Sequence, residues 1–176
     1  NDYFEIKPGG NWENKIILKE IKMPPQAVIL ELKKLRNKKT KPFFDNKIQL
    51  DLNCLWVSAL VSAEQVLPKN NFLQIGESYY EHLEKTFYTK DKLQHTTLKP
   101  EVFLEDYAYS IAMFLDLYHQ TLKPNYLFRA KELCKKTIEL FYVKEKSIFQ
   151  KNIVTTNDLF HKPIDISDGN IPNGNS

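Results

Sequence analysis

The chain has 176 residues, 42% of them hydrophobic, which is enough for one sizeable core and does not require a second domain. Its formal net charge of +3 is modest, and acidic residues are interleaved with basic ones over most of the sequence, which argues against a nucleic-acid-binding surface. No apolar run approaches the roughly 18 residues that a membrane span needs, so we expect no membrane partner.

The cysteines and histidines predict neither a redox site nor a metal site. Cys54 and Cys134 are far apart in sequence, both fall on apolar helical positions, and no C-x-x-C pair occurs. This pattern is typical of buried, reduced thiols in a cytoplasmic protein. The four histidines lack metal-ligand spacing, and no glycine-rich phosphate loop is present. We therefore expect no metal and no cofactor.

Residues 1–22 are interpreted as an extended lead-in with a turn at Pro8 to Gly10. The chain begins at Asn1 without an initiator methionine, so we expect it to be a piece of a longer protein. Met23 to Asn37 predicts a helix with two prolines in its opening turn and cations at its C-terminal end. The basic run Lys33 to Lys41 is interpreted as a solvated helix end.

The stretch Pro42 to Leu67 joins a polar loop to the most apolar helical segment of the sequence. From Leu50 onward the apolar side chains point in nearly every direction of a 3.6-residue wheel, which predicts a helix buried on all sides. Asp45 and Lys47 gather charge at its start, where backbone N–H groups are unpaired and negative charge is favoured. This arrangement suits a ligand site.

The rest of the chain alternates between helix types. Asn71 to Tyr88 and Tyr126 to Tyr142 are amphipathic and predict outer helices, whereas Phe103 to Thr121 is apolar nearly all round and predicts a second inner helix. Between them, Thr89 to Pro100 is polar and predicts a short hairpin or lid. The apolar stripe of the first outer helix consists of Phe72, Ile75, Tyr79, Leu83 and Phe87.

Inner and outer helices in this order, repeated after about 55 residues, predict an all-α fold, a partial (α/α) toroid of helical hairpins. We expect residues 1–176 to form part of one barrel domain, with the lead-in at 1–22, the helical hairpins at 23–142 and a strand or loop tail at 143–176. An incomplete ring exposes the sides of its inner helices. We therefore expect contact with the missing remainder of the polypeptide, or self-association.

Four segments resemble, in the same order, motifs of the YyaL-type proteins (the DUF255 group). They are GNWENKIIL, DNKIQLDLNCL, LEDYA and SDGNIPNGNS. In the second segment Asn46, Leu52 and Cys54 stand where that pattern has Asp, Trp and Gly. The resemblance implies part of an (α/α)6 barrel related to the N-acylglucosamine 2-epimerase fold, which a thioredoxin-like domain precedes in the family.

Carboxyl groups fall at corresponding ends of the two inner helices. Asp45 precedes the first, and Glu105 and Asp106 begin the second. In a toroid these ends line the central cavity, and paired carboxylates there suit acid/base chemistry on a sugar. The same residue types are also ordinary caps that answer the helix dipole. Our catalytic candidates are Asp106 as general acid or base, Asp45 as its partner, and Glu105.

Five residues are candidates for binding a carbohydrate ligand: Lys47, Asn53, Tyr107, Asn173 and Asn175. Asn53 either ties down the loop before its helix or presents its amide to the ligand. Tyr107 either stacks on a sugar or belongs to the core. The N-G turn from Asn173 matches the family motif and would expose backbone N–H groups.

Two functional hypotheses follow. The first is a non-catalytic binding or interaction platform, because Asn46, Leu52 and Cys54 alter what would be a cavity lining. The alternative is a carbohydrate-active isomerase, epimerase or hydrolase that uses cavity carboxylates. Sugar epimerases of the related fold rely on cavity histidines, and here no histidine falls at the start of an inner helix, although His95 lies on the loop that leads to one.

Overall fold

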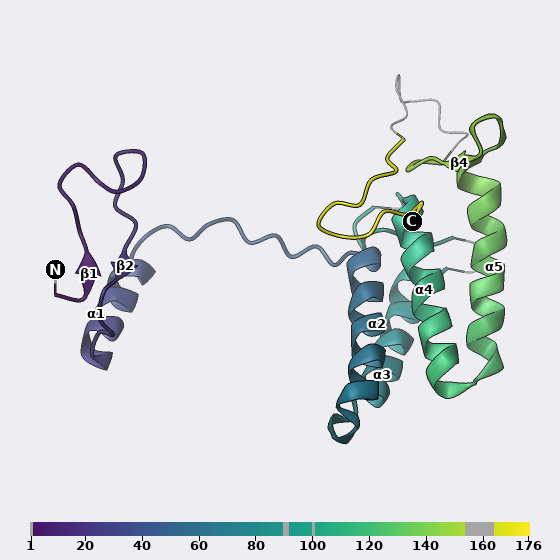
Figure 1. The fold of residues 1–176 in the computed structure, drawn as a ribbon, viewed down its shortest axis with the longest axis horizontal. Helices are drawn as coiled ribbons and strands as arrows, with labels where there is room; N and C mark the ends of the chain where they lie inside the picture. Colours follow the sequence, from purple (N-terminus) through teal and green to yellow (C-terminus); the bar gives the residue numbers. More distant parts are fainter. Residues whose placement is uncertain (1, 90–91, 100, 154–163) are drawn as a thin grey trace. The chain divides into compact units, whose positions relative to one another are not determined.

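The computed structural model describes residues 2–89, 92–99, 101–153 and 164–176. The chain divides into two compact units, Asn1–Asp45 and Asn46–Ser176 (Figure 1). A single barrel domain over 1–176 stays a prediction. His161, part of the predicted tail and part of the loop before Pro100 lie outside the described residues.

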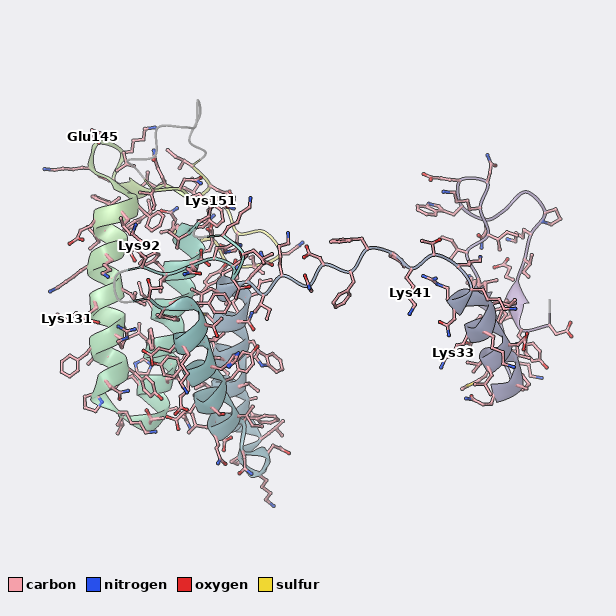
Figure 2. All side chains as sticks on the ribbon, turned by 180° about the vertical axis from the view of Figure 1, so that it is seen from behind. Lys33, Lys41, Lys92, Lys131, Glu145 and Lys151 are labelled. Carbon is pink, nitrogen blue, oxygen red and sulfur yellow. The ribbon has the colours of Figure 1, made fainter. Side chains whose placement is uncertain are left out.

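The first unit is a short antiparallel ribbon followed by one helix. Strand β1 (Phe4–Glu5) pairs with β2 (Lys19–Glu20), and α1 spans Gln26–Asn37, starting after the two prolines. None of the residues of α1 is buried. The basic run is exposed to solvent, with Lys33 on α1 and Lys41 in the segment after it (Figure 2). This unit therefore gains little from core burial.

The second unit consists of two helical hairpins, with bounds α2 (Leu50–Val66), α3 (Phe72–Phe87), α4 (Leu104–Thr121) and α5 (Pro124–Phe141). A 3-10 turn, η1 (Pro68–Asn70), joins the first pair. Helix α2 packs against α3, α4 packs against α5, and α2 and α4 pack against each other (Figure 1). The predicted all-α arrangement of inner and outer helices is confirmed. None of the described helices is long and apolar enough to cross a membrane.

Aromatic side chains hold the two hairpins together. Phe114 of α4 is fully buried, and the ring of Tyr80 from α3 meets it edge-on at 5.3 Å between centroids. Tyr126 of α5 lies 5.5 Å from the same Tyr80 ring, also edge-on. Edge-to-face pairs are favourable because the positive ring edge meets the negative ring face. The outer helices thus contact the core that α2 and α4 form.

One polar cluster lies inside this core. The Tyr88 hydroxyl donates to Ser110 Oγ at 2.7 Å, and the Cys54 thiol lies 3.4 Å from the same oxygen. Burial raises the pKa of Cys54 to about 12, so the thiol stays neutral. Cys54 is the buried thiol that we predicted, but Cys134 is exposed on α5, so that prediction was wrong for the second cysteine.

Helix α2 is not buried on all sides as its composition predicts. Leu52, Trp56 and Val66 are 45%, 54% and 78% exposed, and their spacing places them on one face of the helix. Within Asn46–Ser176, the described residues place nothing over this face. Composition alone predicts burial wherever a segment is apolar, but burial also requires a neighbour on each side.

Helix α3 buries part of its predicted stripe, at Leu83 and Phe87. Ile75 is exposed and Tyr79 only partly buried, whereas Gly76 and Tyr80 are buried. A Cβ built on Gly76 would lie 3.6 Å from the Cβ of Leu60, which is ordinary contact distance. Gly76 therefore lies in the contact between α3 and α2, at a distance that would also admit a methyl group.

A small hairpin follows α5. Strand β3 (Tyr142–Val143) pairs with β4 (Ile148–Phe149) across the 3-10 turn η2 (Lys144–Lys146). The described part of the tail returns from there to the end of the bundle where α2 and α4 begin (Figure 1). The tail thereby completes the surroundings of a cavity at that end.

Candidate functional site

A cavity of about 360 Å³ lies at the N-terminal ends of α2 and α4. Its walls come from the start of each helix, from the loop between the hairpins, and from the tail. The lining residues that carry polar side chains are Gln49, Asp51, His95, Glu105, Lys151, Asp165, Ser167 and Asn173.

Backbone hydrogen bonds hold His95 at this cavity. Its carbonyl accepts from the Leu50 N–H at 2.9 Å, and its own N–H donates to the Glu101 carbonyl at 2.8 Å. Gln49 and Thr96 form an isolated antiparallel bridge alongside. The Phe103 ring meets the imidazole edge-on at 4.9 Å between centroids. The polar loop is therefore joined to the first turn of α2, and His95 faces both inner helices.

The imidazole of His95 is paired with Asp106. His95 Nδ1 lies 2.9 Å from Asp106 Oδ1, and the other carboxylate oxygen accepts the Phe103 N–H at 2.8 Å. The second ring nitrogen, Nε2, lies 3.0 Å from the Gln49 side-chain nitrogen. Because an amide N–H is a donor, this contact assigns Nε2 as an acceptor and leaves the ring proton on Nδ1. Asp106 thus caps α4 and orients a histidine.

Asp106 is fully buried, and this burial raises the pKa of its carboxyl above the ordinary value. The hydrogen bonds from His95 and the Phe103 N–H act in the opposite direction. Burial has the larger effect because it removes the charged form from water. Perturbed carboxyl groups beside a cavity are typical of functional sites.

Asp51 adds a second carboxylate to the same cluster. Its Oδ1 accepts the Leu52 N–H at 2.8 Å and lies 3.9 Å from His95 Nδ1. One atom each of Asp51, His95 and Asp106 lies within 4.8 Å of the others. Among the described residues, these three side chains have the chemistry and spacing to hold a divalent cation.

Glu105 and Lys151 line the cavity with opposite charges. Glu105 begins α4, and its Oε2 is buried without a hydrogen-bond partner among the described residues. Lys151 is exposed, and its carbonyl accepts the Leu104 N–H at 2.9 Å (Figure 2). A buried carboxylate oxygen without a donor is unfavourable, so a ligand that donates a hydrogen bond there would be favoured.

The tail wall is fixed by hydrogen bonds of Asn175 and Tyr109. The Asn175 side chain accepts from the Phe149 N–H at 3.0 Å and donates to the carbonyls of Phe149 and Asp165 at 3.1 Å each. The Tyr109 hydroxyl donates to the Pro172 carbonyl. These contacts hold Asn173, whose N–H donates to Asp168 at 2.7 Å, at the edge of the cavity.

The structure brings some of the predicted site residues together. Glu105 and Asn173 line the cavity, and Asp106 lies directly behind His95. Asn175 supports the wall without lining the cavity. Asn53 uses both ends of its amide within the fold: it donates to the Gln49 carbonyl and accepts from the Tyr79 hydroxyl, each at 2.6 Å.

Other predicted residues lie elsewhere. Tyr107 is 1% exposed and packs against Phe141 at 5.4 Å between ring centroids, so it belongs to the core. Lys47 is exposed and is not among the residues that line the cavity. Asp45 belongs to the first unit, so its predicted pairing with Asp106 stays a prediction.

Sequence analysis missed His95, Asp51 and Gln49 as members of one cluster. Gln49 and His95 are separated by 46 positions, and no motif joins them. The available signal was the polar loop that carries His95, together with an aspartate in the first turn of each inner helix. Only the backbone pairing between that loop and α2 brings them together.

No protein-family model and no curated protein sequence matches the chain. Solved structures that share its fold include two enzymes that act on sugars. The cellobiose 2-epimerase from Bacillus thermoamylovorans B4167 has a TM-score of 0.56 at 19% identity, over 62% of this chain and 30% of that one. A D-mannose isomerase has a TM-score of 0.52 at 14% identity, over 68% and 32%. The chain thus spans about a third of each structure and shares the helical-barrel fold of sugar epimerases and isomerases.

Proposed function

We propose that this chain forms part of a carbohydrate isomerase or epimerase, with His95 as the acid/base group. The observation that carries the proposal is the Asp106–His95–Gln49 chain of contacts at the cavity. The similarity to a cellobiose 2-epimerase and a D-mannose isomerase supports it at the level of the fold. Membership of the YyaL-type group and a cytoplasmic location are further parts of the proposal.

The chemistry requires a base that can take a proton from carbon and return it. In an open-chain sugar, the C2–H bond is acidified by the adjacent carbonyl at C1. His95 Nε2 takes this proton, and the electron pair moves into an enediolate. Return of the proton to C1 gives the ketose. With His95 as the one base, return to the other face of C2, which gives the epimer, requires that the enediolate first turn its other face toward Nε2. Asp106 stabilises the imidazolium that forms, because its carboxylate accepts the Nδ1–H.

A second group is needed to move protons at the sugar oxygens. Glu105 lines the same cavity, and its buried Oε2 has no protein donor in the described structure. A hydroxyl of the substrate can donate to that oxygen. Gln49, which contacts His95 Nε2 at 3.0 Å, must yield this position to the substrate.

The proposal favours the carbohydrate enzyme, which was the alternative hypothesis from the sequence, over the non-catalytic platform. The main hypothesis of a non-catalytic platform rests on altered residues at Asn46, Leu52 and Cys54. Leu52 is exposed away from the core and Cys54 is fully buried, and neither lines the cavity. The carbohydrate-enzyme alternative is therefore supported better.

Proton exchange at carbon tests the proposal. The chain is incubated with mannose, glucose or cellobiose in D₂O, and deuterium at C2 is followed by NMR. We expect exchange by the wild-type chain with at least one sugar. His95→Asn should reduce it by about 10²–10⁴-fold, as expected for loss of a general base.

His82→Asn is the matched control, because His82 is exposed on α3 and is not among the residues that line the cavity. It should leave exchange unchanged. Circular dichroism melts establish that each variant is folded. A folded wild-type chain that neither exchanges C2 hydrogen nor binds any of these sugars at millimolar concentration would contradict the proposal and restore the platform hypothesis.

A further inference from the structure

We infer that the cavity selects sugars with a free ammonium group over neutral and phosphorylated sugars. This inference rests on the proposed function, because it names the substrate class of the same site. It goes beyond the shared fold and follows from the charges, the open acceptors and the occupied N–H groups around His95.

The lining of the cavity has an excess of negative charge. Its described residues include three carboxylates, Asp51, Glu105 and Asp165, and one ammonium group, that of Lys151. Asp106 adds a further carboxyl directly behind His95. A concave site with one sign of charge raises the local concentration of the opposite charge.

The hydrogen-bonding capacity of the lining points the same way. Glu105 Oε2 is a buried acceptor without a donor in the described structure. Asp51 uses one oxygen for the Leu52 N–H at 2.8 Å, and no bond is made to its other oxygen by the described residues. An ammonium group supplies three donors and no acceptor, whereas a phosphate supplies acceptors and negative charge.

Helix N-termini ordinarily attract phosphate through their free N–H groups, and two such termini meet here. In this structure several of those donors are occupied. In α2, the Leu50 N–H donates to the His95 carbonyl, and the Leu52 N–H donates to Asp51. In α4, the Phe103 N–H donates to Asp106. An incoming phosphate would therefore meet carboxylates and fewer free amides than a helix start ordinarily offers.

The electrostatic environment of buried groups agrees with this description. The pKa of Tyr109 is raised, first by burial and then by the negative charges of Glu105, Asp51 and Asp168. Asp51 also raises the pKa of Asp106, although burial is the larger cause. After burial, both pKa shifts have the direction expected beside the carboxylates at this end of the bundle.

The effect of ligand charge can be measured with four ligands that share one hexose skeleton: glucosamine, N-acetylglucosamine, glucose and glucose 6-phosphate. Binding to the 176-residue chain is measured by NMR titration at about pH 6, where primary amines are protonated. We expect glucosamine to bind about tenfold more tightly than glucose and N-acetylglucosamine, and glucose 6-phosphate to bind most weakly. The preference should shrink in 1 M NaCl, where charges are screened over roughly 3 Å.

Two variants test the origin of the preference. Glu105→Gln and Asp51→Asn should each lower the glucosamine preference about threefold or more, because each removes one negative charge while keeping the side-chain shape. Glu81→Gln is the matched control, since Glu81 is exposed on α3 and is not among the residues that line the cavity, and it should leave the preference intact. Circular dichroism melts of each variant report whether the chain is still folded.

A divalent metal ion is the other cation that Asp51, His95 and Asp106 can take. Titrations in the presence of EDTA or of Mn²⁺ distinguish binding of an ammonium group from binding of a metal ion. A glucosamine preference that persists in EDTA supports the inference. Binding of one Mn²⁺ per chain that depends on Asp51, without any preference for glucosamine in EDTA, overturns it.

The failure of this inference differs from the failure of the proposed function. Equal binding of glucosamine, N-acetylglucosamine and glucose would overturn the ammonium selectivity while the isomerase proposal stands. Tighter binding of glucose 6-phosphate would also overturn it. Absence of binding for all four ligands to a folded chain would overturn the inference, and it would contradict the proposed function as well only if mannose and cellobiose also neither bind nor exchange hydrogen at C2.

Discussion

At the scale of single residues, Asp106 combines two roles that sequence analysis kept as alternatives. It occupies the third position of α4, and its carboxylate accepts a hydrogen bond from the Phe103 N–H, as in a capping box. Its other oxygen contacts His95 Nδ1 at 2.9 Å, which orients a cavity histidine. A short carboxylate has two oxygens, so capping does not prevent a role in the site.

The raised pKa of Asp106 predicts a pH-dependent contribution to stability. Because its folded pKa lies above the ordinary 3.8, the folded state holds the proton more tightly than the unfolded state does. The stability that Asp106 contributes should therefore be greatest at low pH and fall as pH rises from 3.8 through the folded pKa. Urea unfolding of wild-type and Asp106→Asn chains, compared between about pH 3 and 7, measures this contribution.

The free energy of unfolding of the wild-type chain, relative to Asp106→Asn, should decrease across that interval. An increase would mean that the attraction between the carboxylate and His95 outweighs the effect of burial. Asp116→Asn on the same helix is the control for the loss of one carboxylate. The difference in free energy of unfolding between wild type and Asp116→Asn should not decrease over this pH interval.

At the scale of elements, the tail is positioned by close contact with the start of α4. A Cβ built on Gly174 would lie 2.7 Å from Leu104 Cγ and 2.8 Å from Cδ2. Leu104 is 2% exposed, so its side chain has little room to move. The glycine therefore lets the tail lie against the helix and form one wall of the cavity.

Gly174→Ala should displace the tail and destabilise the chain by about 1–3 kcal/mol, as overpacking of a filled site does. Sugar binding should weaken at the same time, because Asn173 moves with the tail. Gly169→Ala is the matched control for stability, since a Cβ there meets nothing within 4 Å. Urea unfolding and NMR titration of both variants check this. Equal stability of the two variants would show that the tail does not pack on α4 in solution.

At the scale of the whole molecule, α2 has an apolar face that the described residues of Asn46–Ser176 leave uncovered. Leu52, Trp56 and Val66 recur along it at helical spacing, and large exposed aromatic residues are frequent anchors of protein interfaces. The chain spans about a third of the solved structures that share its fold. We propose that this face binds a second copy of the chain, or the remainder of a longer polypeptide.

Trp56→Glu should convert an oligomer of the 176-residue chain to monomer, because it places a charge in the proposed interface. Size exclusion with light scattering at several concentrations is the measurement. Trp12→Glu is the control, since Trp12 is comparably exposed at 58% but belongs to the first unit. A wild-type chain that is monomeric at every concentration would contradict self-association.

Local sequence patterns determined the helices and the class of the fold. The expected helix over 103–121 differs from α4 by one residue, and that over 71–88 differs from α3 by one residue at each end. Periodicity and end signals act within a few turns of one helix, so a single sequence contains them. The LEDYA segment likewise placed Glu105 and Asp106 correctly at the start of α4.

The tertiary structure decided which side chains meet. His95 reaches the cavity because its backbone pairs with Leu50 and Glu101, and such pairings between loops and helices follow no local period. Trp56 is exposed because burial depends on the neighbours of a helix and not on its composition alone. The sequence by itself therefore determined the helices and their apolar character. Long-range packing determined the site, because the residues that line the cavity lie up to 124 positions apart, from Gln49 to Asn173.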